Sequence, residues 1–373
     1  MKDVMGMIYT GENDGLLREL TITRAVAALP LAGRYRMIDF LMSGMVNSGI
    51  RNVGVVMQKN YHSLMDHLGS GKEWDLHGKN DGLFILPPFL TRENVGVYAG
   101  VLDALRSNSS YLSRSKQEYV ILCNSNMLFN PTFDEMVRCH KESGADVTMM
   151  YTKDPDVCRK DFGAYLTLNE DGRVMDMEID PAAPTCENTY MEVCLLKREL
   201  LRALVDQGVS HGFHDFNRDV LQRLIRDGRL SAMSFLFQDK VWRMDSVQAY
   251  FQCNMALLDT KVRQSLFCPE KPVYTKVRDE MPAKYDEDVQ VVNTLVADGC
   301  VIEGTVENSI LFRGVRISPD ATVKNCVIMQ DTQVMPGAYI ENCILDKQVV
   351  IKRNAKLIGP AAYPIVIAKK VVI

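Results

Sequence analysis

A repeat of 17 residues in the C-terminal part of the chain constrains the fold more than any other feature of the sequence. Aliphatic side chains recur at this interval in three separate phases, and one set of small side chains keeps the same interval. The aliphatic phases are Leu311, Ile328 and Leu345; Ile317, Val334 and Ile351; and Val306, Val323, Ile340 and Leu357, and the small side chains are Ser309, Cys326 and Cys343. Each period divides into two steps of six residues and one of five, which is typical of a hexapeptide β-helix.

Stacked coils of this kind point an aliphatic side chain inward at each corner and bury a continuous apolar column. We therefore predict a left-handed parallel β-helix over residues 290–373, and we expect its repeating side chains to serve packing rather than catalysis. Hexapeptide β-helices also occur in acyltransferases, which usually carry a catalytic histidine on the β-helix. Since no histidine follows His214, the sequence disfavours that activity.

Residues 1–250 show a different pattern, in which short apolar runs alternate with segments of helical periodicity. We expect strands at Val4–Tyr9, Asn52–Met57, Tyr119–Leu122 and Asp146–Tyr151, and helices at Ile38–Ser48, Ser63–Leu68, Gly96–Leu112 and Thr132–Ser143. This alternation predicts a Rossmann-like α/β domain whose mostly parallel sheet is covered on both faces. Because ligands of such sheets bind beyond the carboxyl ends of the strands, the residues after Tyr9, Met57 and Leu122 are the places to look for chemistry.

The two patterns are joined by a segment that belongs to neither. Tyr250–Phe267 is expected to be helical and Pro269–Pro282 to be a connecting loop. The predicted organisation is therefore an α/β domain at residues 1–250, a helix and linker at 251–289, and the β-helix at 290–373. A chain of 373 residues is long enough for two domains of this kind.

Composition and charge exclude several classes of function. A formal net charge of −4 argues against a surface for nucleic acid, and no apolar run is long enough to span a membrane. The ten cysteines form no CxxC pair and the six histidines show no metal-ligand spacing. We expect reduced thiols, a cytoplasmic location, and no metal site built from these residues.

Four sequence motifs, in the same order along the chain, resemble bacterial ADP-glucose pyrophosphorylases, also called glucose-1-phosphate adenylyltransferases. The motifs are RAVAALPLAGRYRMIDF at 24–40, QKNYHSLMDHL at 58–68, AGVLDAL at 99–105 and HDFNRD at 214–219. With the β-helix, the resemblance covers essentially the whole chain. It implies an enzyme fold that joins ATP to glucose 1-phosphate, giving ADP-glucose and diphosphate for glycogen synthesis.

Such a reaction depends on positioning and on charge neutralisation, through a glycine-rich turn, cations on the phosphates and carboxylates that hold Mg²⁺. The resemblance implies that the chain has lost several of these groups. In the glycine-rich turn, Gly11 remains, but Glu12 and Asp14 replace glycines and Leu16 replaces a phosphate-binding arginine.

Four further positions depart from the family at groups that contact phosphate, sugar or metal. Val26 replaces a lysine, Asn126 replaces a metal-binding aspartate, and Asp180 replaces the sugar-phosphate lysine. Arg243 falls near the second metal aspartate, although Asp245 could take over that role. With Leu16, these are the degenerate positions of the site, and we expect no catalytic residue and no cofactor in this chain, with Mg²⁺ in a catalytic partner.

Some nucleotide-side residues keep the family's identity. Gly11, Gln58, Gly100 and Asp103 are the candidates for a vestigial nucleotide-binding site. Two of them have a simpler explanation, since Asp103 could oppose a helix dipole and Gln58 could be a polar residue that ends a strand.

A group of arginines at 24–36 has a separate implication. In the family, cations of this region receive anionic effectors, and Arg24 and Arg36 keep the family's residue type, whereas Arg34 lies between them. The planar donor fork of arginine suits phosphates. The alternative is that these cations belong to a solvated or interface surface.

The leading hypothesis is a regulatory, non-catalytic or weakly catalytic subunit that joins a catalytic glucose-1-phosphate adenylyltransferase subunit in a hetero-oligomer, with a tetramer expected from the relatives. An anionic metabolite is the expected effector, and neither nucleic acid nor a membrane is an expected partner. The alternative is a competent pyrophosphorylase with rearranged metal ligands, for which Asp245 is the candidate.

Overall fold

The chain is described by a computed structural model over residues 1–11, 15–78, 81–88, 98–158, 163–287 and 289–373. It divides into two compact units, each made of segments that are not contiguous in sequence. Unit 1 comprises the described residues of Met1–Glu12, Phe40–Arg243 and Glu270–Tyr274, and unit 2 comprises those of Asn13–Asp39, Met244–Pro269 and Thr275–Ile373.

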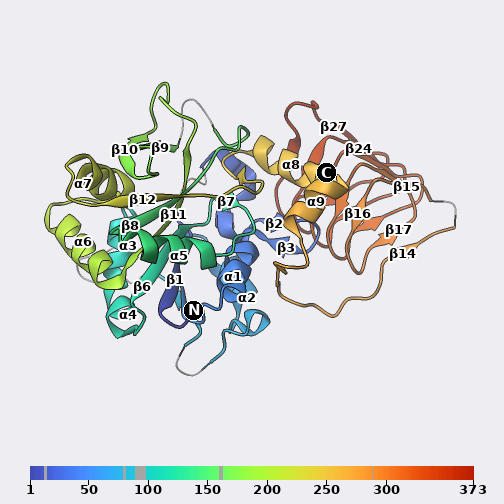
Figure 1. The fold of residues 1–373 in the computed structure, drawn as a ribbon. Coiled ribbons are helices and arrows are strands. Elements are labelled where there is room, and N and C mark those ends of the chain that lie inside the picture. The colour runs from blue at the N-terminus through green and yellow to red at the C-terminus, as the bar shows by residue number, and fades with distance from the viewer. Residues whose placement is uncertain (12–14, 79–80, 89–97, 159–162, 288) are drawn as a thin grey trace. The chain divides into compact units, whose positions relative to one another are not determined.

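Unit 1 is built on a nine-stranded sheet in the described part of the chain (Figure 1). Its strands are β1 (Val4–Tyr9), β4 (Val53–Val56), β5 (Leu83–Leu86), β6 (Tyr119–Asn124), β8 (Val147–Thr152), β9 (Ala164–Leu168), β10 (Val174–Ile179), β11 (Thr189–Lys197) and β12 (Ala232–Leu236). The main path runs β10-β9-β11-β6-β1-β4-β5, and β8 pairs with β11 and β12. Every residue of β1 is buried, as expected for a central strand between two layers.

The middle of this sheet is parallel, as predicted. β1 pairs in parallel with β4 and β6, and β4 with β5. The register pairs Tyr9 with Val56 on one side and with Asn124 on the other, so the carboxyl ends of three strands meet at one edge. Beyond this core, β11 runs antiparallel to β6, β8 and β9.

The helices of unit 1 include α1 (Met37–Asn47, whose first residues group with unit 2), α2 (His62–Leu68), α3 (Val101–Ser107), α4 (Ser109–Arg114), α5 (Asp134–Ser143), α6 (Arg198–Ser210), the π-helix η4 (Phe216–Gln222) and α7 (Arg223–Arg226). The helix expected at Gly96–Leu112 is divided in two, and its first residues lie outside the described ranges. The division falls at Asn108, whose side chain donates to the carbonyl of Ala104 (2.8 Å) and so competes with the helical ladder.

Unit 2 contains the predicted β-helix, which forms three parallel ladders of five strands (Figure 1). The ladders are β14 (Lys284–Tyr285), β17 (Val301–Ile302), β20 (Arg316–Ile317), β23 (Gln333–Val334) and β26 (Val350–Ile351); β15 (Val291–Val292), β18 (Thr305–Glu307), β21 (Thr322–Lys324), β24 (Tyr339–Glu341) and β27 (Lys356–Ile358); and β16 (Leu295–Val296), β19 (Ile310–Leu311), β22 (Val327–Ile328), β25 (Cys343–Leu345) and β28 (Ile365–Ile367). The repeating aliphatic residues and the small residues Cys326 and Cys343 form one buried column. The packing role predicted for them is confirmed.

The boundary expected at residue 250 does not coincide with the units. Unit 2 also holds η1 (Gly15–Leu20), η2 (Val26–Ala28), the short strands β2 (Pro30–Leu31) and β3 (Tyr35–Arg36), and α8 (Val247–Ala256) and α9 (Thr260–Leu266). The Tyr250 hydroxyl donates to the Pro30 carbonyl (2.6 Å), and the Ala32 amide donates to Asn254 Oδ1 (3.3 Å). Because these contacts join α8 to an N-terminal segment, the two segments group together rather than with the sheet. The single helix expected at Tyr250–Phe267 is two helices, α8 and α9.

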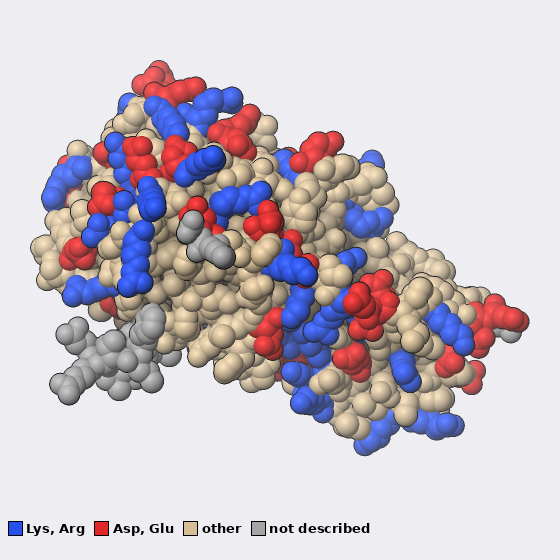
Figure 2. Space-filling model, turned by 90° about the horizontal axis from the view of Figure 1, so that it is seen from below, with Lys and Arg blue, Asp and Glu red and all other residues tan. Residues whose placement is uncertain are grey.

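The surface charges and the cysteines can be placed on the structure. Figure 2 shows acidic and basic side chains interspersed over most of the visible face. All ten cysteines lie within the described residues and none forms a disulfide. Among the described residues, none of the helices has the length and the apolar character needed to cross a bilayer.

Candidate functional site

The carboxyl edge of the parallel core brings together two of the predicted nucleotide-side residues, Gly11 and Gln58. Gln58 follows β4, and its Nε2 donates to the carbonyl of Tyr98 (2.8 Å). A Cβ at Gly11 would lie 2.5 Å from Gln58 Oε1 and 2.7 Å from the Tyr9 hydroxyl, so a side chain there would require Gln58 and Tyr9 to move. Gln58 is buried and holds a backbone segment, which supports the simpler explanation that it terminates a strand.

Gly100 and Asp103 lie together at the start of α3. Asp103 Oδ2 is 2.9 Å from Nδ1 of His214, in the HDFNRD segment. The Leu102 amide donates to the His214 carbonyl (3.1 Å), and a Cβ at Gly100 would clash with that carbonyl oxygen. Asp103 also lies in the first turn of α3, where a carboxylate is favoured by the helix dipole. These two residues therefore hold the His214 segment in place.

Sequence reasoning missed a carboxylate at the same edge of the sheet. Glu192 lies in β11 at an irregularity of the register between Tyr190 and Val193, and its φ is 55°. Its carboxylate accepts hydrogen bonds from Nδ2 of Asn124 (2.6 Å) and Nδ2 of Asn126 (3.2 Å). A glutamate held at this φ is strained by about 1–3 kcal/mol, a cost that functional sites often carry. A lone carboxylate in an apolar strand gave no signal of this arrangement.

The degenerate position Asn126 is thereby placed beside a negative charge. Asn126 is 4% exposed, and its Oδ1 has no hydrogen-bond partner among the residues that the structure describes. Asn124 and Glu192 also line a cavity of about 30 Å³. Its other lining residues are Tyr9, Val101, Leu122, Cys123, Tyr190, Cys194, Phe216 and Asn217. A volume of this size holds about one water molecule.

Asp180, at the position where we predicted loss of a sugar-phosphate lysine, makes several structural contacts. Its φ is 49°, its amide donates to the Gly163 carbonyl (2.8 Å), and its Oδ1 accepts from the Gly163 amide (3.0 Å). Its Oδ2 accepts from the guanidinium of Arg218 (3.0 Å). Arg243 is buried with its guanidinium against Gly163. Any side chain at Gly163 would collide with that guanidinium. The backbone around Asp180 is thus shaped for a carboxylate.

The remaining degenerate positions are in unit 2. Leu16 is 64% exposed on η1, whereas Val26 is buried in η2. Asp245, the candidate for a replacement metal ligand, is buried and groups with unit 2. Glu12 and Asp14 lie outside the described residues.

The oxygen donors near Asn126 fit Mg²⁺ poorly. Mg²⁺ is usually held by one or two carboxylates in octahedral geometry. Glu192 supplies one carboxylate, and its two oxygens already accept amide hydrogens. Within the described ranges, no group of three or more His, Cys, Asp or Glu side chains could hold a metal ion.

A second group of charged residues lies in unit 2. The guanidinium of Arg24 contacts both carboxylate oxygens of Asp346 (2.7 and 2.9 Å), and both side chains are 2% exposed. This pair argues against the effector role predicted for Arg24, because a ligand could reach its guanidinium only by breaking a buried ion pair. Loss of one partner of such a pair typically costs about 3–5 kcal/mol.

Several cations lie near this pair. Burial, with Arg36, Arg24 and Lys369, lowers the pKa of Lys347 to about 7, whereas Asp346 opposes this shift. Sequence reasoning missed Lys347 because the β-helix was interpreted as packing alone. Arg36, Lys347 and Lys369 form what we call the cationic cluster.

The fold and these residues define a class of protein: a nucleotidyl transferase domain followed by a hexapeptide β-helix. Residues 6–260 match the family model of nucleotidyl transferases, and residues 280–361 match that of GlmU-like C-terminal hexapeptide domains. The chain belongs to the family of nucleotidyl transferases that includes the glycogen biosynthesis protein GlgD and glucose-1-phosphate adenylyltransferases.

Three relatives support this assignment. The glycogen biosynthesis protein GlgD of Bacillus subtilis (strain 168) is 37% identical over 99% of this chain and 96% of its own length. The GlgD of Geobacillus stearothermophilus is 37% identical over 85% of this chain and 82% of its own length. A glucose-1-phosphate adenylyltransferase of Thermomicrobium roseum (strain ATCC 27502 / DSM 5159 / P-2) is 36% identical over 81% of this chain and 71% of its own length.

Proposed function

We propose that this chain is a non-catalytic or weakly catalytic subunit that regulates a glucose-1-phosphate adenylyltransferase in cytoplasmic glycogen synthesis. The catalytic partner would bind Mg²⁺ and join ATP to glucose 1-phosphate, giving ADP-glucose and diphosphate. The observation that carries the proposal is the contact between Asn126 and Glu192. In this proposal, the neutral amide of Asn126 stands where a catalytic relative has a metal-binding carboxylate. The neighbouring carboxylate of Glu192 already accepts hydrogen bonds from Asn124 and Asn126.

The electrostatics of unit 1 support this proposal. During transfer of a nucleotidyl group, negative charge develops on the phosphate oxygens in the transition state. Cations and a metal ion must stabilise this charge. At this site, Glu192 and Asp180 add negative charge instead, and Arg218 already faces Asp180. Two unit charges 4 Å apart repel by about 1 kcal/mol even in water, and by more where water is excluded. A triphosphate would therefore be bound weakly and without the groups that align it for attack.

The regulatory part of the proposal rests on the cationic cluster. Arg36 and Lys369 lie close enough to Lys347 to lower its pKa, and Asp346, the carboxylate that opposes them, is already paired with Arg24. An anionic metabolite would relieve this repulsion. Such an effector changes an assembly only if it binds one state more tightly than the other, so the cluster must differ between states of the hetero-oligomer.

The proposal is tested by assaying this chain and a catalytic glucose-1-phosphate adenylyltransferase subunit, separately and mixed at varied ratios. We expect little ADP-glucose from this chain alone. The mixture should show higher activity, or a stronger response to anionic effectors, than the catalytic subunit alone. Robust turnover by the lone chain, abolished by Asn126→Ala, would refute the proposal.

A competent enzyme with rearranged metal ligands is the second candidate. The observation that favours it is the unpartnered Asn126 Oδ1 close to the Glu192 carboxylate, since both are oxygen donors. This candidate requires Mg²⁺-dependent diphosphate release by the lone chain that Glu192→Gln removes. Release that Glu192→Gln leaves unchanged would exclude it.

A further inference from the structure

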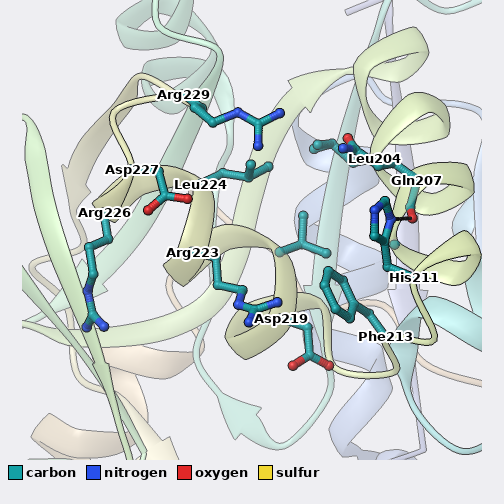
Figure 3. A pocket seen from close by; sticks show the side chains of 12 residues that line it. Leu204, Gln207, His211, Phe213, Asp219, Arg223, Leu224, Arg226, Asp227 and Arg229 are labelled. Carbon is teal, nitrogen blue, oxygen red and sulfur yellow. Dashed lines mark hydrogen bonds between the residues drawn. The ribbon is translucent and has the colours of Figure 1, made fainter.

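Unit 1 has a hollow of about 460 Å³ that the proposed function does not use (Figure 3). It lies between α6 and the segment formed by η4, α7 and the turn after α7. The lining residues are Leu204, Gln207, Gly208, His211, Phe213, Asp219, Val220, Arg223, Leu224, Arg226, Asp227 and Arg229. Sites for small organic molecules have volumes of roughly 300–1,000 Å³.

One part of the lining is apolar and includes planar rings. Leu204 and Val220 are buried core residues, and Leu224 packs beside them. The rings of His211 and Phe213 are stacked, with centroids 5.6 Å apart and planes inclined by 28°. A hydrogen bond between His211 Nδ1 and the Gln207 carbonyl (2.8 Å) fixes the imidazole. This surface suits a planar, largely apolar group.

The other part of the lining carries positive charge. Figure 3 shows the guanidinium of Arg229 reaching from the turn after α7 toward α6, and that of Arg223 beside Phe213. The Arg223 guanidinium lies 4.9 Å from the centre of the Phe213 ring. Among the described residues, neither arginine forms an ion pair. In contrast, Arg226 pairs with Asp176 (3.2 Å) and points away from the hollow.

The acidic residues of the hollow offset this charge only in part. Asp219 Oδ2 accepts hydrogen bonds from the backbone amides of His214 (3.1 Å) and Asp215 (3.0 Å). The negative charge of Asp219 is therefore stabilised by two backbone N–H groups rather than by an arginine of the hollow. Asp227 is the other lining carboxylate, and Figure 3 shows it on the side of α7 that faces Arg226.

We propose that this hollow binds a small organic anion. Its phosphate or carboxylate group would lie against the guanidinium groups of Arg223 and Arg229, because arginine presents a planar set of donors that matches such groups. Its planar, apolar body would lie over Phe213 and His211.

The position of the hollow connects it to the edge of the sheet described above. Asp219 belongs to η4 and fixes the His214 backbone, while the His214 side chain contacts Asp103. π-Helical segments occur most often at functional sites. An anion in the hollow would therefore restrain the same segment that Gly100 and Asp103 hold.

The test is a calorimetric titration of the full chain with phenyl phosphate, compared with inorganic phosphate and with phenol. We expect phenyl phosphate to bind saturably and more tightly than either fragment. Arg229→Gln and Arg223→Gln should each weaken phenyl phosphate binding by about tenfold or more, since each removes a charge-assisted contact. Phe213→Leu should weaken phenyl phosphate binding but not phosphate binding.

Two control variants separate this site from other cations. Arg202→Gln removes a cation of α6 that pairs with Glu199 (2.8 Å) and does not line the hollow, so it should leave the affinity unchanged. Lys352→Met, which removes an exposed cation of the β-helix, should also leave it unchanged. No saturable binding by the unsubstituted chain, an equal affinity in Arg229→Gln, or a loss caused by Lys352→Met would each overturn the proposal. None of these outcomes depends on a catalytic partner.

Discussion

At the scale of single residues, Lys347 shows most clearly how the surroundings of a side chain change its pKa. Burial and the nearby cations bring its pKa to about 7, from an ordinary lysine value of 10.5. Between these two values the unfolded chain binds more protons than the folded chain, so folding stability rises with pH across this window. Below about pH 7 both states carry the charge, and the cost of burying it is fully present.

The same lysine should make anion binding depend on pH. An anion in the cationic cluster raises the pKa of Lys347, so binding takes up a proton above pH 7. We expect the affinity for sulfate, whose charge is constant in this range, to fall from about pH 6.5 to about pH 8.5, by up to about tenfold per pH unit. Calorimetry in buffers of different ionisation enthalpy measures both the affinity and the proton uptake.

Substitution of Lys347 tests whether this residue causes the pH dependence of sulfate binding. Lys347→Met should flatten the pH dependence, whereas Lys352→Met, which removes an exposed lysine of the β-helix, should not. A pH dependence of the same steepness in Lys347→Met would assign the titration to another group.

The sequence predicted where some residues of the candidate site lie, but it did not predict the backbone conformation of the site. The sequence placed Gly11 and Gln58 at the carboxyl edge of the sheet, and the structure confirms that position. It did not indicate Glu192, because the effect of this residue depends on a φ of 55° that turns its carboxylate toward Asn124 and Asn126. Glutamate is not one of the residue types that favour such a backbone angle, so its identity gave no signal.

At the scale of elements, the turns of the β-helix form a ladder of asparagines. Asn308, Asn325 and Asn342 have φ values of 44°, 48° and 53°. Asparagine adopts this left-handed conformation more readily than most residues. Asn325 Nδ2 donates to Asn342 Oδ1 (3.3 Å), and Asn342 Nδ2 donates to the Gly359 carbonyl (2.9 Å). Each turn therefore supports the next.

Replacement of Asn342 separates the two contributions of this ladder. Asn342→Gly keeps the backbone conformation and loses the side-chain hydrogen bonds, each worth about 0.5–1.5 kcal/mol. Asn342→Ala also adds about 1–2 kcal/mol of backbone strain. We expect hydrogen exchange of amides in β24 and β27 to be faster in both variants and fastest in the alanine variant. Equal exchange in the two variants would show that backbone strain is negligible, and Lys356→Ala, at an exposed position of β27, provides the matched control.

Elements with strong local patterns were predicted within about two residues, and the others depended on distant contacts. β1 has the predicted bounds, and α1 and α5 differ from the predicted helices at their ends. The pairing of β11 with three antiparallel neighbours was not predicted, because strand direction depends on the connections and not on the composition of a strand. The first coil of the β-helix was also less evident, since Val291 pairs with Val306, 15 positions later, and so departs from the 17-residue spacing.

At the scale of the whole molecule, the degenerate positions test whether the site can be restored. Replacing Leu16 with Arg, Asn126 with Asp and Asp180 with Lys returns three family residues. We expect this triple variant to release no measurable diphosphate, because Asp180 shapes its backbone turn and Glu192 still adds negative charge. Adding Glu192→Gly, which removes the charge and suits the positive φ, should allow slow Mg²⁺-dependent release.

Diphosphate release by the purified chain is the measurement, with the unfolding midpoint of each variant as the control for folding. Turnover in the triple variant equal to that of the quadruple variant would show that Glu192 does not obstruct the site.

The discontinuity of unit 2 has a consequence for how the protein is made. Unit 1 can be complete once residue 274 has emerged from the ribosome, whereas Arg24 meets its partner Asp346 only after 322 further residues have been added. At about 5–20 residues per second, the N-terminal segment waits roughly 15–65 s with an unsatisfied cation and an uncovered apolar surface. During translation, that nascent segment is therefore the part of the chain with most need of a chaperone.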